Sequence, residues 1–294
     1  MGLQNTALFL ITSFIWGTTW FVIRFQIDST SVVAGVFYRF LIATVLMFLI
    51  NWIFIKRSMR YSFSHHKFFI LQGLFNFCIN YLLTYIAEEH ISSGLVAVTF
   101  TTIIYFNMIG MRLIYKKEIT GALVAGSIIG FAGIVLLFWK EITQSNFNQM
   151  TIFGIVIGIV ATLSASFGNL AAYKNHLNKV PVMTFNAYAM LYGTLFSLII
   201  GLILNQSFYF PTTASFIGSL LYLCVFGTVI TFWAYQTLVG KLGAEKAAYT
   251  SLISPIIAIT FSILFEGLAF NYQMFIGMIL CFLGNYLALK KRPT

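Results

Sequence analysis

The chain has 294 residues, of which 60% are hydrophobic and only 8% are charged, and its mean hydropathy is +0.91. A soluble globular domain carries roughly 25% charged residues, so no water-soluble core could absorb this apolar surface, and lipid must be the solvent. The net charge of +10 could suggest a nucleic-acid partner, but the basic residues lie in short gaps between apolar segments. That distribution argues against nucleic acid and favours charge that sets membrane topology.

Ten segments reach the length of about 20 apolar residues that a membrane-spanning helix needs. In lipid each must be helical, because its backbone groups have to form hydrogen bonds within the segment. We therefore predict an all-α integral membrane protein with ten transmembrane helices. The predicted spans are residues 5–23, 33–55, 68–87, 93–114, 121–139, 152–173, 183–204, 213–238, 243–265 and 272–289.

The basic residues alternate between the gaps of this arrangement. The even-numbered gaps and the C-terminus hold 14 of the 17 lysines and arginines, whereas the odd-numbered gaps hold only Arg24 and Lys140. Positive residues mark the cytoplasmic side, so both termini are predicted to be cytoplasmic in a multi-pass protein of the cell membrane. The regular alternation also supports an even number of spans.

Two stretches of the chain, 94–137 and 243–289, resemble each other. Each contains a long apolar segment, a short link with an acidic residue, and a second apolar segment. Four glycines of the second segments occur at matching separations: Gly126, Gly133, Gly277 and Gly284. The similarity predicts two related halves of five spans, residues 1–140 and 151–290. Because five is odd, the second half must enter the membrane inverted, an arrangement that recurs in secondary transporters.

Polar side chains recur on single faces of several predicted helices. Asn76, Asn80 and Thr84 are spaced by four residues, so they share one face of the third span. Two amides in mid-span are costly without partners, which favours a wet cavity over simple packing for this pair. A lone serine or threonine more often mediates helix packing, and Trp20 could equally be an aromatic residue of the membrane interface.

From these stripes we predict one central cavity with amide, hydroxyl and aromatic walls. The residues predicted to bind a solute in it are Trp16, Thr19, Trp20, Asn76, Asn80, Tyr81, Thr84, Thr99, Asn169, Thr228, Thr231, Tyr235, Tyr249 and Ser254.

Arg39 and Pro255 are the predicted gate or hinge residues. Arg39 lies toward the predicted outer face, where it could pair with Asp28, Glu88 or Glu89, hold a solute carboxylate, or simply extend to the interface. Pro255 frees a backbone carbonyl in mid-membrane and predicts either a fixed kink or a hinge. An acidic residue near the edge of the membrane costs little free energy. No acidic residue lies in the middle of a predicted span, so the sequence shows no obvious proton relay.

No catalytic, metal or cofactor site is predicted. The four histidines are scattered through gaps on both sides, and no metalloprotease, serine-hydrolase or phosphate-loop motif occurs. The three cysteines, Cys78, Cys224 and Cys281, fall in apolar segments without metal-ligand spacing, and we interpret them as packing residues. An intramembrane enzyme is therefore excluded in this interpretation.

Several local motifs resemble the EamA-type branch of the drug/metabolite transporter superfamily. Residues 15–20 (Ile-Trp-Gly-Thr-Thr-Trp) and Arg24 are similar to its first-helix pattern, and Tyr38-Arg39-Phe40 is similar to the start of its second helix. Further matching positions are Ser92-Ser93-Gly94-Leu95, Leu242-Gly243-Ala244, Ser254-Pro255, Glu118 and Glu266. The resemblance covers nearly the whole chain and implies transport of small organic solutes.

We therefore predict a secondary transporter of small organic solutes across the cytoplasmic membrane, working by alternating access. Export of amino acids or related aromatic metabolites is favoured by the aromatic stripes and by the resemblance. The alternative is an accessory or lipid-handling membrane subunit without solute transport. The expected partners are a small organic solute and the lipid bilayer, and the sequence leaves the oligomeric state open.

Overall fold

The computed structural model describes residues 3–55, 59–117, 121–137, 139, 149–242, 247 and 250–289. These residues are largely helical and contain no strand, which confirms the predicted all-α class. The elements in chain order are α1 (Leu3–Ile27), α2 (Val32–Ile50), η1 (Asn51–Ile55), α3 (Phe63–Gln72), η2 (Gly73–Ile79), α4 (Asn80–His90), α5 (Ser93–Thr99), η3 (Phe100–Thr102), α6 (Ile103–Tyr115), α7 (Gly121–Leu137), α9 (Gln149–Leu177), α10 (Val182–Ile203), α11 (Ala214–Cys224), η4 (Val225–Ile230), α12 (Thr231–Leu242), α14 (Thr250–Phe265) and α15 (Tyr272–Leu289).

Seven helices of the described chain are long and apolar enough to cross a membrane. They cover Leu3–Ile27, Val32–Phe54, Phe63–His90, Ser93–Tyr115, Gln149–Leu177, Val182–Ile203 and Ala214–Lys241. Three shorter apolar helices, Val124–Leu137, Ile253–Phe265 and Tyr272–Gly284, fall within the remaining predicted spans. The full count of ten spans and the inverted repeat stay predictions.

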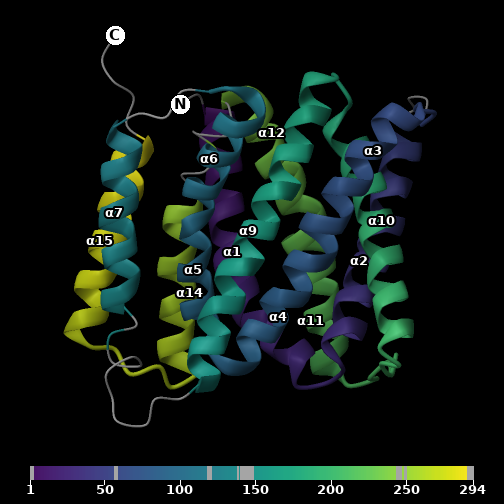
Figure 1. Ribbon diagram of the computed structural model, residues 1–294. Helices are drawn as coiled ribbons and strands as arrows, with labels where there is room; N and C mark the ends of the chain where they lie inside the picture. The colour runs from purple at the N-terminus through teal and green to yellow at the C-terminus, as the bar shows by residue number, and fades with distance from the viewer. Residues whose placement is uncertain are drawn as a thin grey trace.

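The helices stand side by side as one bundle, and α1 begins at the same end of it at which α15 finishes (Figure 1). Large apolar side chains such as Phe14, Leu113, Phe131 and Leu202 are exposed on its outside. A continuous apolar exterior of this kind suits contact with lipid tails rather than water.

Helices α7 and α15 pack together along one edge of the bundle, although they lie far apart in the sequence (Figure 1). A Cβ atom at Gly277 would lie only 2.7 Å from the backbone nitrogen of Leu137, and one at Gly133 only 2.6 Å from that of Cys281. The Cys281 thiol also donates to the Gly130 carbonyl at 3.6 Å. The matched glycines thus allow the two backbones to touch, as small residues do between membrane helices.

Two helical rods contain a stretch of wider π-helix in mid-length. η2 lies between α3 and α4, and η4 lies between α11 and α12, about ten residues after the start of each rod. These are the third predicted helices of the two halves. Such stretches often occur at functional sites because they release backbone groups from the regular α-helical ladder.

Amide side chains also link α3, α9 and α10 inside the bundle. Gln72 donates to the Asn186 side-chain oxygen at 3.0 Å and accepts from the Asn175 amide at 3.1 Å, and all three residues are buried. The sequence prediction did not include this network. Each amide helps to satisfy another without water, so the chain holds three helices in register.

Candidate functional site

A cavity of about 100 Å³ lies in the centre of the bundle, between elements of both predicted halves. One water needs about 10–15 Å³ of such space, so the cavity has room for a small solute or several waters. Twelve of the sixteen predicted solute, gate and hinge residues line it: Trp16, Thr19, Trp20, Arg39, Asn76, Asn80, Tyr81, Thr84, Asn169, Tyr235, Ser254 and Pro255.

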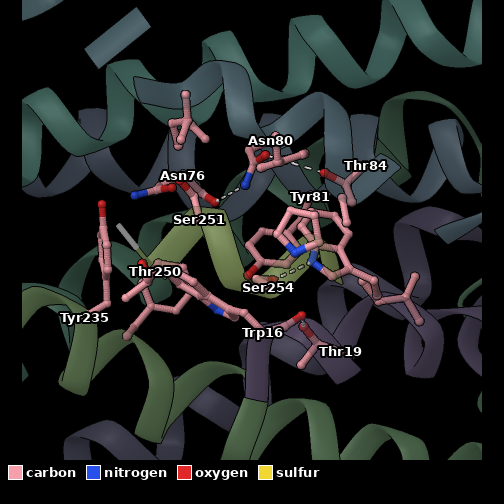
Figure 2. A pocket seen from close by; sticks show the side chains of 18 of the residues that line it. Trp16, Thr19, Asn76, Asn80, Tyr81, Thr84, Tyr235, Thr250, Ser251 and Ser254 are labelled. Carbon is pink, nitrogen blue, oxygen red and sulfur yellow. Dashed lines mark hydrogen bonds between the residues drawn. The ribbon is translucent and has the colours of Figure 1, made fainter. Parts of the chain in front are cut away.

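The amides form one hydrogen-bonded wall of the cavity. Asn76 in η2 donates to the Asn169 side chain of α9 at 3.2 Å, and the Asn80 amide donates to the Asn76 carbonyl at 3.3 Å. Thr84 donates to the Asn80 side-chain oxygen at 3.5 Å. Figure 2 shows Asn76, Asn80 and Thr84 along one edge of the cavity, with Trp16 and Thr19 of α1 along the other. The wall offers both donors and acceptors to a solute.

Aromatic rings form much of the remaining wall. The Trp16 ring centre lies 4.9 Å from that of Tyr235 and 5.6 Å from that of Phe232, and the Trp20 ring lies 4.7 Å from Phe100. The Trp20 indole nitrogen donates to the Ser254 hydroxyl at 3.3 Å. Trp20 is thus a cavity residue and not an aromatic residue of the membrane interface.

Among the described residues, Arg39 is the one charged side chain that lines the cavity. It is 1% exposed, which contradicts the interpretation that it extends to the membrane surface. Its Nε donates to the Thr228 hydroxyl at 3.0 Å and its Nη2 donates to the Gly227 carbonyl at 3.4 Å, both in η4. The guanidinium also lies 4.5 Å from the centre of the Tyr81 ring. It forms no ion pair with a carboxylate of the described residues, so its contacts are neutral.

A further polar partner of Arg39 is Tyr85, whose hydroxyl accepts from Nη1 at 3.5 Å. The π-helical turn of η4 supplies the Gly227 carbonyl and the Thr228 hydroxyl that Arg39 also contacts. The sequence could not indicate this, because a widened turn leaves no recognisable residue pattern. The predicted pairs of Arg39 with Asp28, Glu88 or Glu89 do not form in the described structure.

Pro255 also lines the cavity, inside α14, which continues as a helix through it. The kink and the hinge interpretations both stay predictions. Thr250 and Ser251 also line the cavity, on the same helix as Ser254 (Figure 2).

Three predicted solute residues lie outside the cavity wall. Thr99 donates to the Val96 carbonyl at 2.7 Å, and Thr231 donates to the Phe226 carbonyl at 2.6 Å. Thr228 meets Arg39 instead of the cavity and also donates to Leu223. The contacts of these three hydroxyls fit a role in helix packing better than a role in binding a solute. The fourth, Tyr249, lies outside the described residues, as does Glu118.

The remaining lining residues did not appear among the predicted solute residues. They are Ile23, Ala97, Phe100, Ile103, Ala165, Phe232, Thr250 and Ser251. Six of them are apolar, and an apolar residue within a membrane span carries no signal that separates a cavity wall from packing against a neighbour. Thr250 and Ser251 lie on α14 close to Ser254. Their position just before Pro255 was the feature of the sequence that could have indicated them as cavity residues.

A smaller cavity adjoins the central one and shares two residues with it, Asn169 and Tyr235. These two side chains therefore stand between the cavities. Among the described residues no group of three or more histidine, cysteine or acidic side chains could hold a metal ion.

The apolar bundle, with a cavity between its helices that carries several polar side chains, defines a multi-pass membrane protein. The model of the EamA-like transporter family matches residues 6–139 and again residues 152–290. The chain therefore belongs to the EamA-like transporter family, as its motifs suggested.

Relatives with curated names agree with this assignment. Protein PagO of Salmonella typhimurium is 28% identical over 97% of this chain and 92% of its own length. The uncharacterized transporter YoaV of Bacillus subtilis is 25% identical over 90% and 88%, and the uncharacterized inner membrane transporter YedA of Escherichia coli K12 is 26% identical over 83% and 77%. A protein crystal structure matches with a TM-score of 0.71 at 15% identity, over 97% of this chain and 96% of that one, which shows a shared fold.

Proposed function

We propose that this membrane transporter moves a small carboxylate-bearing solute, an amino acid or a related aromatic metabolite, by alternating access. Arg39 is the observation that carries the proposal. A buried guanidinium beside a cavity, with only neutral partners, leaves its charge available to a solute anion. Charge-assisted hydrogen bonds from arginine to carboxylate are among the stronger ones in proteins.

The other walls of the cavity suit the rest of such a solute. The rings of Trp16, Trp20, Phe100 and Phe232 offer an apolar and aromatic surface, and the Asn80 amide offers polar contacts. Pockets with mainly apolar walls and a few placed polar groups are typical small-molecule sites. Export is the direction that we propose from the sequence.

Alternating access requires two halves that can rock about a central site. Residues 1–140 and 151–290 both line the cavity, both match the family model, and each contains a π-helical stretch in its third predicted helix. These features support, as parts of the proposal, the ten spans, the inverted repeat, the predicted binding role of the lining residues and the cytoplasmic termini.

The test begins with a thermal-shift screen of amino acids and aromatic metabolites on the purified protein, because a ligand of the folded form raises its melting temperature. Stabilising compounds are then assayed for flux in liposomes. We expect Asn80→Leu to abolish saturable flux while the protein stays folded. The matched control is Thr260→Val, which changes an exposed hydroxyl of α14 and should leave flux unchanged. Unchanged flux in Asn80→Leu would show that the Asn80 amide takes no part in binding the solute.

Two comparisons separate the remaining parts of the proposal. Flux measured in right-side-out and inverted membrane vesicles tests the outward direction. Absence of flux for every stabilising compound, together with lipid movement between leaflets, would favour the lipid-handling alternative and overturn solute transport.

A further inference from the structure

A second large cavity, of about 580 Å³, opens near the end of the bundle at which α1 finishes and α5 begins. We call it the acidic vestibule. Its lining residues are Phe21, Arg24, Phe25, Asp28, Glu88, Glu89, His90, Ile91, Ser92, Phe265 and Glu266. By the charge distribution of the sequence this end faces the outside of the cell.

Glu88 is the unusual member of the vestibule. It is 0% exposed, and neither of its carboxylate oxygens has a hydrogen-bond partner among the described residues. Arg24 forms no ion pair with the carboxylate, because its Nη1 donates to the backbone carbonyl of Glu88. The charges of Arg24 and Arg39 act on Glu88 only from a distance. The burial of Glu88 contradicts the expectation from sequence that it lies at the membrane edge, where a charge costs little free energy.

Glu266 shares the vestibule but has partners for one of its oxygens. Its Oε2 accepts from the Ser262 hydroxyl and from the backbone nitrogen of Ser93, the latter at 3.1 Å. Its Oε1 has no partner among the described residues. Four carboxyl groups thus line the vestibule, those of Asp28, Glu88, Glu89 and Glu266. Of Glu88 and Glu266, only Glu266 has donors that stabilise a negative charge.

An isolated buried carboxylate without a partner costs many kcal/mol, so such a group either takes up a proton or holds a cation. A metal ion needs several oxygen ligands in a defined shell, and no suitable group of residues exists in the described part of the chain. The positive charge of Arg24, which lines the same cavity, would also repel a metal ion bound there. A proton needs only one carboxylate oxygen.

We propose that Glu88 is a proton-binding site that exchanges protons with water of the acidic vestibule and couples solute movement to the proton gradient. A hydronium ion in the vestibule gives up the proton: one of its O–H bonds breaks, an O–H bond forms on one Glu88 oxygen, and water is left. In the coupled cycle the Glu88 O–H bond breaks after the change of access, and the proton passes to water on the other side of the membrane. No other reactant is required. The coupling rests on the proposed function, whereas the protonation of Glu88 does not.

Charged and titratable groups act on Glu88 from several elements packed around it. They are Arg24 and Asp28 of α1, Arg39 of α2, Tyr85, Glu89 and His90 of α4, and Glu266 after α14. Helix α5 contains no charged residue, and Lys174 and His176 of α9 lie in its last turn, whereas Gly154 near its start faces His90. Loss of the Glu88 charge on protonation would therefore change the field at the arginines of both cavities.

The first experiment needs no solute. Infrared difference spectra of the full-length protein in lipid detect the carbonyl stretch of a protonated carboxylic acid. The spectra are recorded only above about pH 6, where carboxyl groups with an ordinary pKa of about 4 stay ionised and give no such band. We expect this band in the wild type and in Glu89→Gln, which alters the exposed neighbouring carboxylate, and its loss in Glu88→Gln. A band retained in Glu88→Gln would overturn the proposal, as would stabilisation by Na⁺ that depends on Glu88 without any such band.

The same variant provides a check on folding. Glutamine resembles the neutral carboxyl group in shape and charge, so Glu88→Gln should melt at or above the wild-type temperature. A markedly lower melting temperature would mean that a charged Glu88 stabilises the structure, and it would contradict a bound proton.

The second experiment measures coupling, with a solute taken from the screen described above. Flux into liposomes is compared with and without an imposed pH gradient. The ratio of the two should exceed one in the wild type and in Glu89→Gln, and should fall to one in Glu88→Gln. An unchanged ratio in Glu88→Gln would refute coupling alone. No wild-type flux for any solute would refute the proposed function and leave the infrared result as the test of protonation.

Discussion

Replacing Arg39 by methionine tests the proposed carboxylate contact most directly. Methionine keeps the length and apolar contacts of the stem but removes the charge and all donors to Thr228, Gly227 and the solute. A hydrogen bond to a charged group contributes about 1.5–3 kcal/mol, so the variant should bind the solute roughly 10- to 150-fold more weakly.

The assay compares two ligands that differ only in the group that Arg39 contacts. One is an aromatic amino acid that stabilises the wild type, and the other is the amine that results from loss of its carboxylate. We expect Arg39→Met to weaken binding of the acid by the stated factor and to change binding of the amine little. Arg39→Lys keeps the charge but loses the planar donor pair and the stacking on Tyr81, so it should fall between the two.

Two results would refute this reasoning. Equal losses for acid and amine would mean that Arg39 only supports the fold through η4. Unchanged binding of the acid would mean that the guanidinium does not contact a carboxylate at all. Melting temperatures of the unliganded variants separate a general loss of stability from a loss of recognition.

Two further predictions concern the packing of the bundle. Gly277→Leu should lower the melting temperature clearly, because even its Cβ would lie 2.7 Å from the backbone nitrogen of Leu137, whereas Gly218→Ala on α11 meets no atom within 4 Å and should be neutral or stabilising. Asn186→Leu should cost about 1–3 kcal/mol by leaving the Gln72 amide without its acceptor, as measured by unfolding in detergent. Adding Gln72→Leu should then cost less than the sum of the single changes, and full additivity would disprove the network.

Much of the central cavity could be predicted from helical periodicity. Asn76, Asn80 and Thr84 recur at intervals of four and do lie together on the cavity wall. Helical periodicity groups these three side chains because buried amides in lipid need polar partners, and several helices offer such stripes; their role in binding a solute stays a prediction. It failed for single hydroxyls such as Thr99, because a threonine can satisfy its hydroxyl on its own helix.

Charged residues near the predicted membrane edge were harder to place. Arg39 and Glu88 both seemed accessible to water from their position in the chain, yet both are buried. The position of a residue along a helix indicates its depth in the membrane. The burial of its side chain depends instead on which neighbouring helices pack over it at that depth. The turn of η4 covers Arg39, and the junction of α1, α5 and α14 covers Glu88.

By itself the sequence determined the membrane class, the helical fold, the family and the polar faces of individual helices. These properties follow from composition, period and local motif, which are read within one segment. Only the tertiary structure decided which faces meet: the contact of α7 with α15, the apolar part of the cavity wall, and the burial of Arg39 and Glu88 without an ion pair among the described residues. Those features depend on segments more than a hundred residues apart, and no local pattern specifies which partner a helix face will meet.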